Sequence, residues 1–152
     1  MEPDVPATVK ELKRWMKQRC FNFNSYSIHG NTIYEGFGID TSRGVYTWYY
    51  TERGQRHDLE YFSSEQEIVL YAFNKIESDS WARTHMIGFG GSEKAHEELA
   101  AKLIDLGIEF LQDSITNFYA VNHPAYRTFV YGCDVHKVGH LKKVYFKEKR
   151  II

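Results

Sequence analysis

Residues 45–62 read VYTWYYTERGQRHDLEYF, two strand-like runs on either side of the pair Arg53-Gly54. Side chains of a strand alternate between two faces, so Tyr46, Trp48 and Tyr50 share one face of the first run. This aromatic stripe is typical of a side turned toward a core, although an exposed stripe would suit stacking or docking. A two-residue connection joins antiparallel neighbours, so the segment predicts a β-hairpin with a positive φ at Gly54.

Period-two patterning also precedes the hairpin, where Ile33, Phe37 and Ile39 share a face. A third strand there makes a β-meander. Capping residues predict helices over residues 8–20, from Ser64 through at least residue 76, and after Ser92. Apolar residues at helical spacing mark the buried sides of these helices: Val9, Leu12, Met16 and Cys20; Ile68, Val69, Ala72, Phe73 and Ile76; Ala95, Leu99, Leu103, Leu106 and Phe110.

The patterns weaken toward the C-terminus. Residues 81–87 favour further helical turns, glycines at 88–91 indicate a break, and residues 118–121, 126–131 and 144–146 favour strands. Strands followed by helices predict an α+β fold, an antiparallel β-meander packed against three or more α-helices. The 152 residues fit a single domain spanning positions 1–152.

Composition narrows the class of protein. Hydrophobic residues make up 43% and charged residues 26%, so neither disorder nor a fibrous chain is expected. The N-terminus is acidic and poor in apolar residues, unlike a signal peptide, and no apolar run is long enough to span a bilayer. Two cysteines form no disulfide framework and suit a reducing compartment. We therefore expect a cytoplasmic protein without a membrane partner.

Charge is unevenly distributed along the chain. The net charge of -1 argues against a protein that coats nucleic acid. Residues 58–113 nevertheless hold 12 acidic side chains against four basic ones. These acids either solvate helix surfaces or form a landing surface for a basic partner, and aromatics, at 16% of the chain, suit protein recognition.

Three sequence patterns have some features of chemical sites. Cys133, His136 and His140 have zinc-ligand spacing, but a second ligand pair is missing. The glycines at 88–91 precede a helix start, yet they lack the spacing of a phosphate-binding loop. His57 has no second histidine placed beside it for acid–base catalysis. We therefore expect no catalytic residues, no metal and no cofactor.

Three segments together resemble the immunity protein 63 family: YTWYYTERGQ at 46–55, DLE at 58–60 and EQEIVLY at 65–71. The resemblance covers about residues 44–85 as an aromatic strand, an E-R-G turn, a second strand and an acidic-capped helix. These bacterial proteins protect a cell from polymorphic or contact-dependent inhibition toxins. The resemblance implies a cytoplasmic, non-enzymatic inhibitor that binds the toxin's C-terminal domain, expected to be a nuclease, in a stoichiometric complex.

For that role we expect a monomer or weak homo-oligomer whose toxin-binding residues are Glu65, Glu67, Glu77, Asp79, Trp81 and Arg53. Reversing the four acids together should then slow association and reduce its salt dependence. Arg53 either pairs with Glu52 or a helix carboxylate, or reaches a carboxylate of the toxin.

Two other functions stay open. The same aromatic and acidic surface would serve an adaptor or regulatory binding module. A small hydrolase or ribonuclease would instead use His57, His123 or the group from Cys133 to His140.

Overall fold

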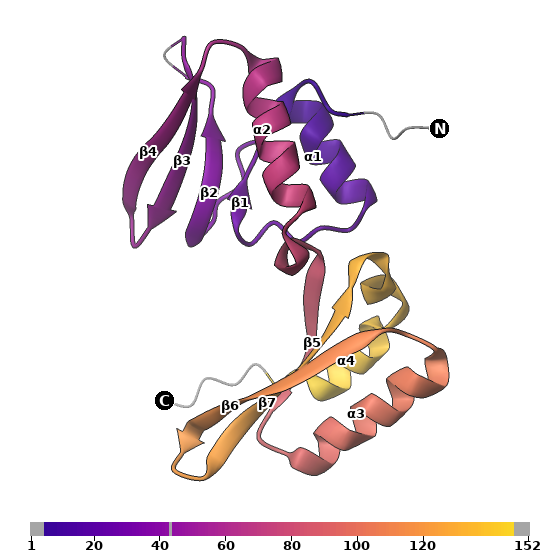
Figure 1. The fold of residues 1–152 in the computed structure, drawn as a ribbon. Helices are drawn as coiled ribbons and strands as arrows, with labels where there is room; N and C mark the ends of the chain where they lie inside the picture. Colours follow the sequence, from indigo (N-terminus) through magenta and orange to yellow (C-terminus); the bar gives the residue numbers. More distant parts are fainter. Residues whose placement is uncertain (1–4, 43, 148–152) are drawn as a thin grey trace. The chain divides into compact units, whose positions relative to one another are not determined.

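The computed structural model describes residues 5–42 and 44–147, which belong to two units, Met1–Arg83 and Thr84–Ile152. Each unit has its own β-sheet and its own helices (Figure 1). The α+β class is therefore confirmed, with two sheets rather than one. The prediction of a single domain over residues 1–152 stays a prediction.

The predicted hairpin lies in the sheet of the first unit. Its strand order is β1-β2-β3-β4, with β1 parallel to β2 and the others antiparallel. The bounds are β1 Tyr26–Ser27, β2 Glu35–Asp40, β3 Tyr46–Glu52 and β4 Gln55–Phe62. The meander of β2, β3 and β4 is thus confirmed, and the short β1 adds a parallel strand beside β2.

The turn between β3 and β4 has positive φ at both central residues, 52° at Arg53 and 79° at Gly54. This geometry matches the right-handed twist of the two strands. The prediction of a positive φ at Gly54 is confirmed.

Strand β4 contains a bulge. Trp48 lies opposite Glu60 and Tyr49 lies opposite Asp58, so Leu59 is an extra residue without a partner on β3. Because of this extra residue, Glu60 and Phe62 lie on the same face of the sheet as Trp48.

Two helices, α1 Val9–Gln18 and α2 Glu65–Glu77, pack on one face of this sheet (Figure 1). Thr8 and Ser64 cap them by accepting hydrogen bonds from the third residue of each helix. The expected apolar stripe of α2 is buried in the core that contains Trp48. Both helices are therefore confirmed, although α1 ends at Gln18, so Cys20 lies beyond the helix.

Truncating this stripe should destabilise the protein. Ile68 is fully buried and Phe73 nearly so. We expect Ile68→Ala or Phe73→Ala to lower the free energy of unfolding by about 2–5 kcal/mol, because each leaves a cavity in the core. Urea denaturation followed by circular dichroism measures the loss. A change below about 0.5 kcal/mol would mean that α2 does not bury this face.

The second unit has a three-stranded antiparallel sheet of order β5-β7-β6. Its elements are β5 Thr84–Gly90, α3 Glu93–Leu106, β6 Phe110–Ala120, β7 His123–Tyr131 and α4 Gly139–Tyr145. Two 3-10 turns, Ser80–Arg83 and Gly132–Lys137, precede β5 and α4. Ser92 caps α3 as predicted.

Several expectations for this unit were wrong. Of the helical turns expected over residues 81–87, only residues 81–83 are helical, in a 3-10 turn, and residues 84–87 belong to β5. Gly88 lets Leu99 of α3 pack closely against this strand. Residues 139–145 form α4 instead of a strand at 144–146, with Leu141 and Tyr145 buried one turn apart. Leu106 is 53% exposed, and Phe110 begins β6.

Candidate functional site

Glu65 and Glu67, which were predicted to contact the toxin, form hydrogen bonds at the N-termini of helices. Glu65 accepts a hydrogen bond from the Val9 N–H at 2.9 Å. It thereby supplies a partner for one of the backbone N–H groups that the first turn of α1 leaves unpaired. Glu67 accepts hydrogen bonds from the hydroxyls of Ser63 at 2.8 Å and Ser64 at 2.9 Å. These bonds, the one from Ser63 most, lower the pKa of the Glu67 carboxyl. Both acids therefore have structural roles inside the first unit.

Asp79 also has a structural role. It accepts hydrogen bonds from the Tyr26 hydroxyl at 2.7 Å and from the Trp81 N–H at 3.0 Å. Burial raises the pKa of Tyr26 far above its usual value, and the bond to Asp79 and its charge add to this. By contrast, Glu77 is exposed and forms no ion pair or hydrogen bond within the described part of the chain. The Trp81 side chain is 57% exposed.

Arg53 is exposed in the turn after Glu52, and it forms no ion pair with any described residue. The reading in which Arg53 pairs with Glu52 or a helix carboxylate is therefore wrong for residues 5–42 and 44–147.

The six predicted contacts lie at two ends of the first unit. Helix α2 has 13 residues, so its ends are about 18 Å apart. Glu65 and Glu67 begin the helix, whereas Glu77, Asp79 and Trp81 lie at or after its end, as does the β3–β4 turn (Figure 1). Reversing the four acids together would break helix caps as well as change charge, so that experiment does not isolate electrostatics.

The acidic segment is divided between the two units. Residues 58–79 contribute six acids to the first unit, and residues 93–113 contribute six to the second. Each unit is close to neutral, with 12 acids against 10 bases in residues 1–83 and eight against nine in residues 84–152.

One face of the first sheet presents an ordered arginine that the sequence did not reveal. Arg56 donates through Nη1 to Asp40 and through Nε to Asp58, both at 2.7 Å. Its guanidinium lies 4.3 Å from the centre of the Tyr49 ring. That ring covers Gly38, where a Cβ would meet it at 2.4 Å. The arginine on this face is therefore already neutralised by carboxylates of the same chain.

Replacing Asp40 should produce a pH-dependent loss. The Ser42 hydroxyl, the Ser42 N–H and Arg56 together lower the Asp40 pKa from 3.8 to about 2. Because the pKa of Asp40 is lower in the folded state than in the unfolded state, the ionised carboxylate stabilises the fold above the unfolded-state pKa. This stabilisation is lost as the pH falls toward 2. We expect Asp40→Asn to cost about 1–2 kcal/mol at pH 7, after discounting for solvent screening.

Urea unfolding of wild type and Asp40→Asn between pH 2 and 7 measures this loss. The difference should be constant above about pH 5 and shrink between pH 4 and 2. A difference that stays constant down to pH 2 would show that the Asp40 carboxylate does not supply the stability.

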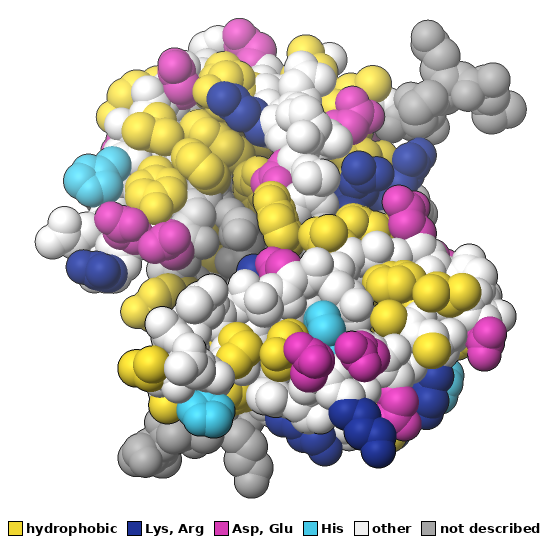
Figure 2. All heavy atoms as spheres, turned by 60° about the horizontal axis from the view of Figure 1, so that its bottom comes forward, with side chains coloured by type: hydrophobic (Ala, Val, Ile, Leu, Met, Phe, Trp, Pro, Cys, Tyr) yellow, Lys and Arg dark blue, Asp and Glu magenta, His cyan; other side chains and the backbone are white. Residues whose placement is uncertain are grey.

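The opposite face of the sheet is covered by α1 and α2 only in part. Alternation places six side chains on its uncovered part, near the β3–β4 turn, which we call the open face: Glu35, Phe37, Tyr50, Glu52, His57 and Glu60. All but Phe37 and Tyr50 are exposed, and these two rings are partly buried. Figure 2 shows hydrophobic side chains gathered on the first unit with charged side chains at their border.

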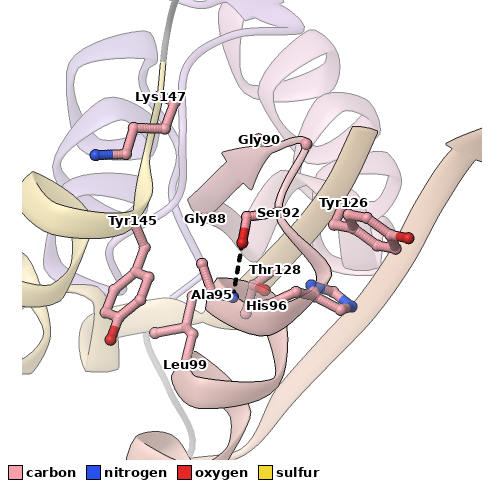
Figure 3. Close-up of a pocket in the computed structure, with 11 residues that line it drawn as sticks. Gly88, Gly90, Ser92, Ala95, His96, Leu99, Tyr126, Thr128, Tyr145 and Lys147 are labelled. Carbon is pink, nitrogen blue, oxygen red and sulfur yellow. Dashed lines mark hydrogen bonds between the residues drawn. The ribbon is translucent and has the colours of Figure 1, made fainter. Parts of the chain in front are cut away.

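The second unit has a small pocket at the start of α3 (Figure 3). Its volume is about 70 Å³, below the roughly 300–1,000 Å³ usual for ligand pockets. His96 lines it, and the Gln112 amide donates to the His96 carbonyl at 2.9 Å and the Thr128 hydroxyl at 3.0 Å. Burial lowers the His96 pKa, against the pull of nearby acids. His96 is therefore ordered beside a space smaller than a usual ligand pocket.

The glycines at 88–91 do not form a phosphate-binding loop. Gly88 and Gly90 belong to β5, so a strand does precede the helix, contrary to expectation. The Glu93 carboxylate stands in the first turn of α3 and accepts a hydrogen bond from the Tyr126 hydroxyl at 3.2 Å. This negative charge opposes an anion at the same place.

The zinc-like spacing does not produce a ligand cluster. Cys133 and His136 lie in the 3-10 turn and His140 in α4, and within residues 5–42 and 44–147 no three His, Cys, Asp or Glu side chains gather to hold a metal. Neither Cys20 nor Cys133 has a free thiol, so the cysteine count no longer supports a reducing compartment.

Comparison with protein families, curated proteins and solved structures gives no match for this chain. None of the helices in the described part of the chain has both the length and the apolar character to cross a membrane.

Proposed function

We propose that this protein is an immunity protein that neutralises a cognate toxin domain by binding it, without turnover. The proposal begins from the resemblance of residues 46–71 to immunity proteins. All of these residues lie in the first unit. Strand β4 is the structural observation that supports it most. All residues of β4 from Gln55 to Tyr61 are exposed, in a strand bonded to β3 on one side.

An exposed edge strand with aromatic and acidic side chains suits recognition of a folded partner. Tyr61 and Leu59 supply apolar area, which stabilises a complex when water is excluded. Acidic side chains accelerate encounter with a basic protein, and nucleases that bind nucleic acid are commonly basic. The inhibitor would then occupy the toxin surface that the substrate needs.

Co-expression tests the proposal. The tagged chain is produced with the toxin C-terminal domain encoded by the adjacent upstream gene, and the purified pair is titrated by calorimetry. We expect a one-to-one complex and rescue of growth in cells that make the toxin. A toxin domain that neither binds nor loses toxicity in the presence of this chain would refute the proposal.

A further inference from the structure

Two like charges oppose each other on the open face. Glu35 on β2 lies directly opposite Glu52 on β3. Directly opposed residues of antiparallel strands have Cβ atoms about 5 Å apart, and like charges there destabilise the sheet. Within residues 5–42 and 44–147 neither carboxylate has an ion pair, and Arg53, the next residue after Glu52, supplies none. The chain therefore keeps a repulsive pair without neutralising it.

Aromatic rings adjoin this pair and hold part of it in place. The Tyr50 hydroxyl donates to Glu52 at 3.0 Å, and the Tyr50 and Phe37 rings are 5.1 Å apart. Burial, the bond to Glu52 and the charges of Glu35 and Glu52 all raise the pKa of Tyr50. One carboxylate is thus oriented before any partner arrives, beside an apolar surface.

A third acidic side chain on the open face, Glu60, carries the same sign of charge. Glu60 on β4 is exposed and also lacks an ion pair among the described residues, whereas Arg56 is held by two aspartates on the other face. A divalent metal ion would need about six oxygen ligands, more than these side chains supply. A guanidinium or ammonium group needs fewer, and its aliphatic stem packs on rings.

We propose that the open face is the docking surface for the toxin, and that it takes a basic side chain of the toxin between Glu35 and Glu52 with its stem against Tyr50 and Phe37. This inference rests on the proposed function and specifies its contact. It explains why an unfavourable pair is kept, since binding would supply the missing positive charge.

The test removes both charges without changing the shape of the side chains. We compare wild type with Glu35→Gln/Glu52→Gln, titrating each with the toxin C-terminal domain from the adjacent gene. We expect affinity to fall at least tenfold, with a weaker dependence on salt, because two charge-assisted contacts are lost. Glu97→Gln/Glu98→Gln is the matched control, since it removes two exposed acids from α3 and should leave affinity unchanged.

Urea unfolding of the free protein separates docking from a structural role. Because the substitution relieves repulsion, the midpoint of the double variant should equal or exceed that of wild type. Equal toxin affinity for wild type and the double variant would overturn this inference while leaving the proposed function intact. Loss of affinity accompanied by a lower midpoint would also overturn it.

Two further results bear on the occupant. If wild type itself does not bind the toxin domain, the proposed function and this inference both fail. If sedimentation equilibrium shows that the free wild type self-associates and the double variant does not, the open face takes a second copy of the chain, which overturns the inference.

Discussion

Trp48→Ala should cause the largest loss of stability of any single side-chain truncation in the first unit, about 3–5 kcal/mol. The Trp48 side chain is 2% exposed. Its ring stacks on Phe37 at 5.5 Å and meets the edge of Tyr71 of α2 at 5.6 Å. Removing it opens a cavity and ends contacts that join the meander to the helix.

Urea denaturation followed by circular dichroism measures the loss, with Tyr34→Ala as a matched control. Tyr34 is also aromatic and precedes β2, but it is 83% exposed, so its removal should change stability by no more than about 0.5 kcal/mol. If Trp48→Ala cost less than about 1 kcal/mol, Trp48 would not be central to this core.

Gly36→Ala should cost about 3 kcal/mol or more, although it adds a single methyl group. Gly36 has a φ of 144°, a backbone conformation that residues with a side chain rarely adopt. A Cβ at this position would also clash with the Ser25 carbonyl oxygen, at 2.1 Å. That carbonyl also accepts a hydrogen bond from the Phe37 N–H. The backbone cannot move away without breaking the contact between the segment before β1 and β2.

Gly54→Ala separates backbone strain from steric clash. Gly54 also has a positive φ, 79°, but nothing lies within 4 Å of its Cβ position. Its substitution should therefore cost only about 1–2 kcal/mol, the strain of the left-handed conformation. The same urea titration measures the loss of stability of both variants. Equal losses would mean that the Ser25 backbone moves away from the added methyl group at little cost.

The first unit was largely predictable because its signals are local. The Arg53-Gly54 turn, the alternation in β3 and the caps Thr8 and Ser64 each act within a few residues. In the second unit, residue types and structure disagree. The glycines of β5 indicated a break, but Gly88 is required where Leu99 packs against the strand, a contact between segments 11 residues apart.

The candidate site was less predictable, for two physical reasons. Glu35 lies opposite Glu52 because of the register between β2 and β3. Residue types along the chain do not specify that register closely enough to predict the pair. The role of Glu67 was visible in advance, because Ser64 and Glu67 form a capping box, and a capping carboxylate is less free to contact a partner. Glu65 and Asp79 were not visible, since their partners lie more than 50 residues away.

The bulge at Leu59 bears on how this chain stays dispersed. An unpaired edge strand is a template for strands of other molecules, and long flat edges promote fibrils. In β4 the extra residue interrupts the regular row of backbone donors and acceptors, and Arg56, Asp58 and Glu60 place charges along the same edge. Indiscriminate backbone pairing between copies of the chain is therefore hindered along this edge.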